Sequence, residues 1–323
     1  MIHSLELKNF RAFEHLQFKD LGRANLILGG NNTGKTSILE SLVLRLGSGE
    51  QISKLPAMFR QSVDQDANMN YWNLIPGCKG WERLAICTDG QCRAVAQHGS
   101  QFLFQGENSR QRGPVFTMQN GQFRPSNAGP ETSLAILPTA PRSPAEISES
   151  FNQIAPLNPA NEDQLQNLLA ATIEPRLKRL RYARPKETRT HLIYADLGEG
   201  SMLPFTQLGQ AFTRTLEIYC EIFANQPKVL LIDEIENGLY YEGLEDFWRG
   251  LLGVLEDQDV QLFATTHSRE CMEAAHRAAR ERDDDPLRYL RLDRKVDDAT
   301  QIIATSFGSE EMEAAIRSDL EMR

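Results

Sequence analysis

The stretch GGNNTGKT at residues 29–36 decides the fold of this chain. It matches the pattern G-x-x-x-x-G-K-[ST] in full, follows the apolar run ANLIL (24–28) and opens the amphipathic run TSILESLVLRL (36–46). A glycine turn between a strand and a helix lets backbone N–H groups close round phosphate oxygens at the positive end of the helix. The stretch therefore predicts a P-loop in which Lys35 neutralises the β- and γ-phosphates and Thr36 ligates Mg²⁺.

A second buried strand is predicted by VLLIDEIENG at residues 229–238, where four aliphatic residues end abruptly in Asp233 and Glu234. In a P-loop fold this strand ends beside the phosphates, so we expect Asp233 to hold Mg²⁺ through its hydration shell and Glu234 to polarise the attacking water. The cation would allow the two neighbouring carboxylates to stay charged together. The plainer interpretation is an acidic strand end in solvent.

A third strand, QLFATTHS at 261–268, ends in polar residues and places His267 near the γ-phosphate or the attacking water. A single histidine is more often structural, and that alternative stays open. Strands alternating with helices over THLIYADL (190–197), GQAFTRTLEIYCEIF (209–223) and KVLLID (228–233) predict a parallel α/β sheet.

The middle of the chain has a different composition. Residues 51–140 are rich in Gln, Asn, Gly and Pro with short β-branched or aromatic runs, which predicts an inserted antiparallel β-subdomain. Residues 141–190 show helical spacing of Ile and Leu and predict a small helical subdomain. We therefore expect one domain over 1–323, with N-terminal strands and P-loop in 1–50 and the remaining lobe in 191–323.

Composition sets the class of protein. A net charge of −9 and no long apolar run predict a soluble, cytoplasmic protein without a membrane span or signal peptide. The five cysteines form no C-x-x-C pair, which argues against a zinc site and a disulfide framework. Cys87 and Cys92 flank the turn sequence TDGQ and should face each other across a hairpin. We expect reduced thiols there, because a reducing compartment removes the reason for a bond.

One basic stretch stands out in this acidic chain. EPRLKRLRYARPKETRTH (174–191) holds seven Lys or Arg against two Glu, and it indicates either a solvated helix end and loop or a contact with nucleic-acid phosphates. The acidic run ERDDDP (281–286) follows a polar helix and is interpreted as a solvated loop.

The order of five motifs resembles that of known proteins. LKNFRAF, GGNNTGKT, LPFTQLGQAFTR, LLIDEIENGL and FATTHSRE follow one another as in ABC-type ATPase heads, and they closely resemble the ATPases of the OLD family and their short AAA-type relatives in bacterial antiphage defence. The resemblance implies a homodimer that closes head to tail round two Mg-ATP. It assigns the signature loop to Thr206, Leu208, Gly209 and Gln210, and the D-loop to Glu236 and Asn237.

The sequence departs from these families at three places. Ala211 stands where signatures usually have a second glycine, and Tyr240 stands where many relatives have histidine. No convincing Q-loop is present, because Gln101, Gln105 and the PTAPRS segment around Arg142 are all weak candidates.

The full set of expected site residues follows from the motifs and the resemblance. The expected catalytic residues are Lys35, Glu234 and His267, and the expected metal-binding residues are Thr36 and Asp233. The expected nucleotide contacts are Gly29, Asn31, Asn32, Thr33, Gly34, Lys35, Thr36, Ser37, Thr206, Gly209, Gln210 and Asn237.

What the motifs lack also narrows the function. The segment between Lys35 and Asp233 carries no heptads, so long coiled-coil arms are not expected, and no Toprim pattern follows His267. The resemblance therefore implies an ATPase that regulates a separately encoded effector, with a nuclease as the expected kind. A RecF-like DNA-repair clamp is the main alternative, and an ATP-binding transporter subunit is a third.

Overall fold

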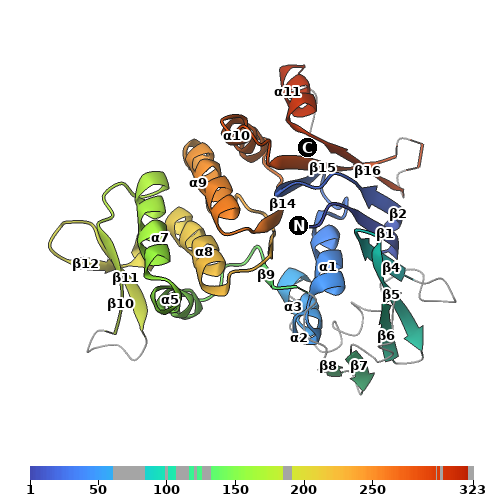
Figure 1. Ribbon diagram of the computed structural model, residues 1–323, viewed down its shortest axis with the longest axis horizontal. Coiled ribbons are helices and arrows are strands. Elements are labelled where there is room, and N and C mark those ends of the chain that lie inside the picture. The colour runs from blue at the N-terminus through green and yellow to red at the C-terminus, as the bar shows by residue number, and fades with distance from the viewer. Residues whose placement is uncertain are drawn as a thin grey trace.

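The computed structural model describes residues 1–60, 84–98, 101–106, 116–119, 122–125, 132–184, 191–295, 297–298 and 301–318. Its centre is a six-stranded sheet in the order β16-β15-β3-β14-β13-β9, parallel except for β16 (Figure 1). The strands are β3 (Ala24–Gly29), β9 (Leu134–Leu137), β13 (Val229–Ile232), β14 (Gln261–Thr265), β15 (Leu287–Arg294) and β16 (Ile302–Phe307). The predicted parallel α/β sheet is confirmed.

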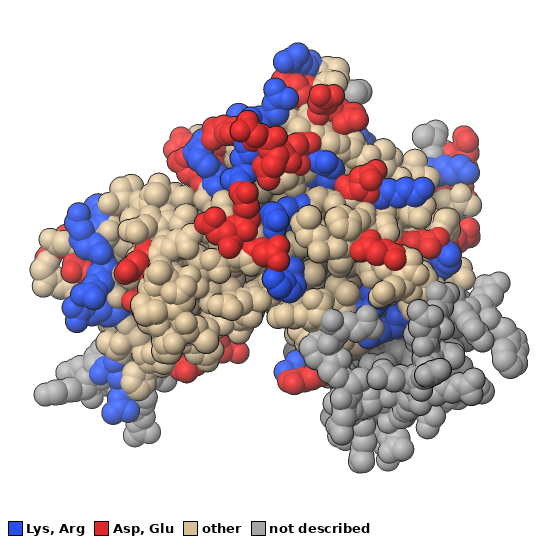
Figure 2. All heavy atoms as spheres, viewed as in Figure 1, with Lys and Arg blue, Asp and Glu red and all other residues tan. Residues whose placement is uncertain are grey.

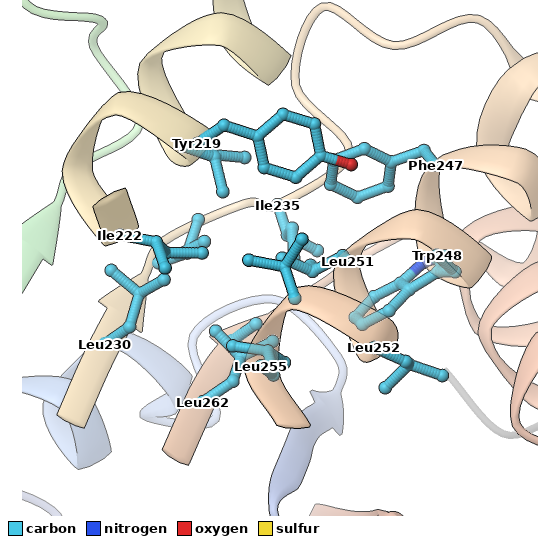
Figure 3. Close-up of a cluster of buried hydrophobic side chains, with 14 of the residues drawn as sticks. Tyr219, Ile222, Leu230, Ile235, Phe247, Trp248, Leu251, Leu252, Leu255 and Leu262 are labelled. Carbon is cyan, nitrogen blue, oxygen red and sulfur yellow. The ribbon is translucent and has the colours of Figure 1, made fainter. Parts of the chain in front are cut away.

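Helices cover both faces of this sheet because β3, β13 and β14 are apolar on both sides. On one face, Leu230 and Ile232 pack with α8 (Gln210–Asn225), α9 (Leu244–Asp257) and α10 (Arg269–Arg280). On the other, Leu231 and Phe263 pack with α1 (Lys35–Leu46). Figure 3 shows the first cluster, in which Tyr219 of α8 and Trp248 of α9 close over β13 and β14.

A second sheet is antiparallel and has the order β2-β1-β4-β5-β6. Its strands are β1 (Leu5–Phe10), β2 (Phe13–Phe18), β4 (Leu84–Thr88), β5 (Gln91–His98) and β6 (Gln101–Gly106). The expected insertion over 51–140 therefore has different limits: β4 pairs with the N-terminal β1, and β9 pairs with β13 in the central sheet. Short elements complete this region, namely α2 (Gly49–Ser53), α3 (Leu55–Arg60), β7 (Phe116–Gln119) and β8 (Gln122–Pro125).

The expectation of reduced thiols in the β4–β5 hairpin is wrong for this structure. Cys87 and Cys92 are directly paired across the hairpin, as expected, but their sulfurs form a disulfide. The two-residue turn Asp89–Gly90, with positive φ at both residues, places the cysteines opposite each other, which is the arrangement that a bond needs. Cys220 and Cys271 are buried free thiols.

A separate lobe lies beyond α8, on the far side from the antiparallel sheet (Figure 1). It contains α5 (Pro144–Asn152), α6 (Ile154–Leu157), α7 (Pro159–Thr172), β10 (Arg179–Ala183), β11 (Leu192–Asp196), β12 (Met202–Pro204) and η1 (Phe205–Gln207). Here two expectations are wrong. The strand predicted over 190–197 does not join the parallel sheet, because β11 pairs antiparallel with β10 and β12. The basic stretch is not a helix end, because it includes the strand β10.

The C-terminal part follows α10. Residues 281–286 form the predicted loop, and β15, β16 and α11 (Ser309–Arg317) come after it. A short turn, η2 (Tyr241–Gly243), precedes α9. None of the helices in the described ranges is both long and apolar enough to cross a bilayer.

Candidate functional site

The loop between β3 and α1 has the backbone that its glycines allow. Gly29 and Gly34 have φ of 141° and 95°, in the region that favours glycine. A Cβ on Gly29 would lie 2.5 Å from the carbonyl oxygen of Leu292, and one on Gly34 would lie 2.6 Å from the Phe13 ring. The loop is therefore closely fitted by β15 on one side and by the start of β2 on the other, so its N–H groups are fixed in place.

Lys35 lies inside the curve of this loop. Its Nζ donates to the carbonyl oxygens of Gly29 and Gly30 at 2.7 and 2.8 Å, and the residue is buried. Burial lowers the pKa of Lys35 to about 8, although the charges of Asp233, Glu234 and Glu236 oppose the shift. An incoming anion would favour the charged ammonium of Lys35. A ligand with several phosphate oxygens would therefore interact favourably with this side chain.

The other predicted loop residues divide by exposure. Asn31 and Asn32 are exposed at the tip, and Arg294 of β15 donates to the carbonyl oxygen of Asn32 at 3.0 Å. Thr33 and Ser37 are buried, with Thr33 donating to the carbonyl of Gly30 at 3.0 Å. The tip therefore offers polar atoms to a ligand, while the base of the loop is held by internal bonds.

Asp233 stands at the end of β13 and is almost fully buried. Three hydroxyl groups donate to its carboxylate: Thr265 at 2.7 Å, Thr139 at 3.2 Å and Thr36 at 3.3 Å. The structure thus brings together Thr36 and Asp233, the two expected metal-binding residues. Sequence reasoning did not predict Thr139 or Thr265, which follow β9 and end β14; both strands neighbour β13, so their carboxyl ends reach the same edge.

Glu234 has a left-handed backbone with φ of 49°, and its N–H donates to the Thr265 hydroxyl at 2.8 Å. Its carboxylate lies 3.7 Å from Nε2 of His267, and both side chains are about two-fifths exposed. The backbone N–H of His267 donates to Glu236 at 2.8 Å. Glu234 and His267, whose roles were expected separately, therefore lie side by side with an open side towards solvent, which a general base for water requires.

The expected signature and D-loop residues meet at a different place. Thr206, Gly209, Gln210, Asn237 and Gly238 line one pocket of about 230 Å³. Asn237 also donates through its side chain to the carbonyl of Thr139 at 3.1 Å. Within the described ranges, no hydrogen bond or ion pair joins the signature residues to the P-loop of the same chain. A Cβ on Gly209, whose φ is 89°, would meet nothing within 4 Å, so the start of α8 is open to an approaching molecule.

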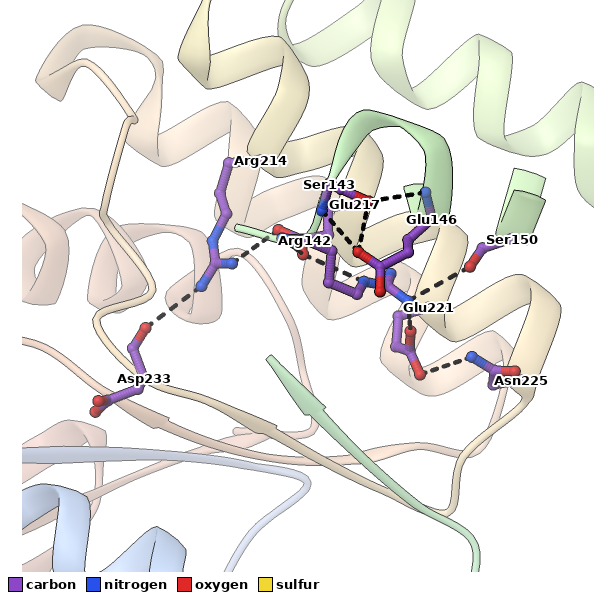
Figure 4. A network of polar contacts seen from close by, with 9 residues as sticks. All are labelled: Arg142, Ser143, Glu146, Ser150, Arg214, Glu217, Glu221, Asn225 and Asp233. Atoms are coloured by element: carbon purple, nitrogen blue, oxygen red, sulfur yellow. Dashed lines mark hydrogen bonds and ion pairs between the residues drawn. The ribbon is translucent and has the colours of Figure 1, made fainter. Parts of the chain in front are cut away.

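Arg142, one of the weak Q-loop candidates, belongs to a buried ion-pair network (Figure 4). Its Nη1 lies 2.7 Å from Glu221, and both its backbone N–H and its Nε contact Glu217, at 2.9 and 3.3 Å. These bonds fix the segment after β9 against α8. The other candidates, Gln101 and Gln105, are on β6, and their side chains lie outside the described part of the chain.

The same network reaches the end of β13. Arg214 contacts Glu217 at 2.9 Å and donates to the backbone carbonyl of Asp233 at 3.4 Å. Arg214 and Glu217 are both buried, at 4% and 0% exposure. Removing one member of such a pair leaves an uncompensated charge and costs about 3–5 kcal/mol. The start of α8 and the end of β13 are therefore held together by charge as well as by packing.

These residues fit a nucleotide with a divalent cation. Among the described residues, no group of three or more His, Cys, Asp or Glu could hold a metal alone. A hard cation shared between a hydroxyl, one carboxylate and phosphate oxygens needs no such group. Thr36 and Asp233, which are hydrogen-bonded at 3.3 Å, supply that donor set next to the P-loop.

Comparison with known proteins identifies the family. A model described as "AAA domain, putative AbiEii toxin, Type IV TA system" matches residues 107–273, just over half of the chain. A second, described as "AAA ATPase domain", matches residues 1–70. The chain belongs to the AAA-domain family. It is an ATPase of the AAA/ABC type.

Individual relatives of this AAA-domain protein are distant. An "ATP/GTP phosphatase" of Helicobacter pylori is 22% identical over 88% of this chain and 90% of its own length. A "DNA replication and repair protein RecF" of Rickettsia felis is 38% identical, but over only 20% of this chain and 18% of its own. An SMC head bound to the C-winged helix domain of ScpA matches with a TM-score of 0.57 and 14% identity, over 97% of this chain and 99% of that one. The last match confirms the predicted ABC-type head fold.

Proposed function

We propose that this ATPase binds Mg-ATP at the P-loop, closes head to tail with a second copy, and by this cycle regulates a separately encoded effector. In this proposal Lys35 holds the phosphates, Thr36 and Asp233 hold Mg²⁺, and Glu234 with His267 acts on the attacking water. The cation would neutralise developing charge on the phosphates. The protein would work in the cytoplasm.

One observation carries the proposal. The ends of four neighbouring strands bring the P-loop, the hydroxyl-bound Asp233 and the half-exposed Glu234–His267 pair to a single edge. Phosphoryl transfer needs little from a protein besides positioned charge and a positioned water. This edge supplies both.

Two features support closure with a second copy. Gly209 has open space round its Cα, and the signature and D-loop residues share a pocket that makes no hydrogen bond to the chain's own P-loop in the described ranges. A helix N-terminus left open in this way suits an anion that is brought by another molecule. The anion that fits the proposal is the γ-phosphate of the ATP held by the second copy.

The role of the effector rests on the likeness of the motifs to ATPases of the OLD family in antiphage defence. A nuclease is the kind of effector proposed. Genes for a nuclease beside the gene of this protein, and loss of phage restriction when either is removed, would support that setting.

The test of the catalytic proposal is Glu234→Gln. The amide cannot accept the proton of water, so turnover should fall by about 10²–10⁴-fold while ATP still binds. We also expect the variant to accumulate as an ATP-dependent dimer on a sizing column, because hydrolysis no longer opens it. Asp233→Asn should instead weaken Mg-dependent ATP binding. Hydrolysis by Glu234→Gln at the wild-type rate would show that the base is another group.

A RecF-like DNA clamp is the second candidate. It is favoured by the short match to RecF over one fifth of the chain and by exposed basic residues within 174–191, the segment proposed to contact nucleic acid. Nucleic acid that stimulates hydrolysis without any effector would favour the clamp. Hydrolysis that responds only to an effector protein would favour the first proposal.

A further inference from the structure

The strand β10 presents two arginines without acidic partners. Arg179 and Arg181 are exposed and lie two residues apart, on one face of the strand. Within the described residues, no carboxylate oxygen lies at ion-pair distance from either guanidinium. Arg176, in the preceding turn, differs, because it is bound by Glu174 at 3.0 Å and Glu199 at 3.1 Å.

Several exposed arginines elsewhere on the described surface are paired with carboxylates. On α9 and α10, Arg249 contacts Glu281 at 2.6 Å, and Arg277 contacts Glu245 at 2.6 Å. Figure 2 shows Lys and Arg gathered at the end of the molecule that Figure 1 labels β10, β11 and β12, with a few Asp and Glu among them. In a chain of net charge −9, unpaired arginines on one strand form a local site for an anion.

A groove lies beside these arginines, between α6 and β10. It has a volume of about 440 Å³, and Arg179 and Arg181 line it together with Glu162 and Tyr182. Its apolar wall is formed by Phe151, Ala155, Pro156 and Leu180. Small-molecule sites in proteins commonly have volumes of about 300–1,000 Å³, so the groove is large enough for a small ligand group. We call this site the β10 arginine groove.

The carboxylates around the groove have hydrogen-bond partners other than the two arginines. Tyr182 donates to Glu149 at 2.8 Å, and the N–H of Gly198 donates to Asp196, which pairs with Arg179 in register. Burial raises the pKa of Glu162, and the charge of Asp163 adds to the shift, whereas Arg179 opposes it. Because no described carboxylate lies at ion-pair distance from Arg179 or Arg181, both guanidinium groups remain available to an incoming anion.

We propose that the β10 arginine groove binds single-stranded nucleic acid, with phosphates on Arg179 and Arg181 and a base in the groove. Arginines two residues apart on a strand stand about 6.6 Å apart, which is comparable to one step of an extended nucleotide chain. Single strands expose bases that stack on apolar and guanidinium surfaces, whereas a duplex keeps its bases inside. The inference deepens the nucleic-acid contact of the second candidate function, the RecF-like clamp, and rests on it.

The experiment measures binding of a labelled oligothymidylate of about 16 nucleotides to the full chain by fluorescence anisotropy, at two salt concentrations. A blunt duplex of the same length is measured in parallel. In the double variant Arg179→Gln/Arg181→Gln, we expect single-strand affinity to fall about tenfold and the salt slope to lose about 1.4, or 0.7 for each phosphate contact. Ala155→Gln, which narrows the groove without changing charge, should weaken single-strand binding severalfold and leave duplex binding unchanged.

The matched control is Arg277→Gln/Arg282→Gln, which removes the same charge from α10 and the loop that follows it, where both arginines contact carboxylates. It should bind like the wild type. Duplex bound as tightly as single strand, or single-strand binding unchanged in the β10 variant, would overturn the inference. Competition by oligoglutamate as effective as by oligothymidylate would also overturn it, and would assign the groove to an acidic protein segment. ATP hydrolysis is measured in a separate assay. A protein that binds the oligothymidylate but does not hydrolyse ATP would contradict the proposed function and not this inference.

Discussion

Two regions use their charged residues in opposite ways: the edge of the central sheet that carries the P-loop and Asp233, which we call the edge, and the lobe beyond α8. At the edge, Lys35 is buried on two carbonyl oxygens and Asp233 is surrounded by three hydroxyl groups. In the lobe, Arg179 and Arg181 are exposed and have no acidic partner among the described residues. The difference indicates that the edge is preorganised for one small ligand, whereas the lobe offers a surface that a larger partner would neutralise.

The two regions are nevertheless joined. Arg142 lies just before α5, the first helix of the lobe, and Glu217 and Arg214 carry its ion pairs along α8 to the carbonyl of Asp233. These contacts link the first segment of the lobe to the end of β13 that carries Asp233. The edge, its connection to the lobe and the charge of Lys35 can each be changed separately.

The largest expected effect concerns the edge. In Lys35→Ala the phosphates lose an ammonium in a partly dry site, so ATP affinity should fall by about 10³-fold, or about 4 kcal/mol. Isothermal titration calorimetry measures it directly. Lys54→Ala, at an exposed lysine 2.6 Å from Glu50, is the control and should bind ATP normally. If both variants bound ATP alike, the edge would not be the nucleotide site.

The second effect concerns the connection. Glu217→Gln leaves Arg142 and Arg214 without the carboxylate that joins them, so the free energy of unfolding should fall by about 3 kcal/mol. Denaturation by urea measures this change. Glu199→Gln removes an exposed partner of Arg176 and should cost less than about 1 kcal/mol. If the free energy of unfolding fell equally in the two variants, the buried network would not hold the regions together.

The smallest effect concerns the charge of Lys35. Its pKa in the nucleotide-free protein is lowered to about 8, and bound phosphates would raise it again. The free protein therefore loses the ammonium as the pH rises through 8, and ATP affinity should decrease above that pH by no more than about tenfold per pH unit. Titrations between about pH 7 and 9.5 test this. Lys35→Ala should show no such dependence, and a pH-independent wild type would contradict the shift.

Much of the edge was predictable because short local patterns encode it. GGNNTGKT gave the loop, and the apolar run that ends at Asp233 gave the strand beside it. Thr139 and Thr265 were not predicted to donate hydrogen bonds to Asp233, because no local sequence pattern distinguishes a threonine at the end of a strand that does so. Their roles depend on the strand order β14-β13-β9, which the sequence does not state.

The lobe and the sheet edges were predicted less well. The strand β11 has the same alternation as a strand of a mixed sheet, so nothing local showed that it pairs with β10 and β12. The strands β15 and β16 were not predicted at all, although β15 pairs with β3 along the whole length of β3. The thiols of Cys87 and Cys92 were expected to be reduced because of a reducing compartment, but the hairpin places the two sulfurs so that they form a disulfide.

The sequence by itself determined the P-loop, the acidic end of β13 and the histidine after β14, because each depends on residues within one turn or one strand end. Only the tertiary structure decided which hydroxyls surround Asp233, where the basic strand lies and which arginines stay unpaired. Those properties depend on contacts between segments far apart in the chain, such as Thr36 with Asp233 or Arg142 with Glu217. The pairing of strands and the burial of charges set such contacts, and no local pattern records them.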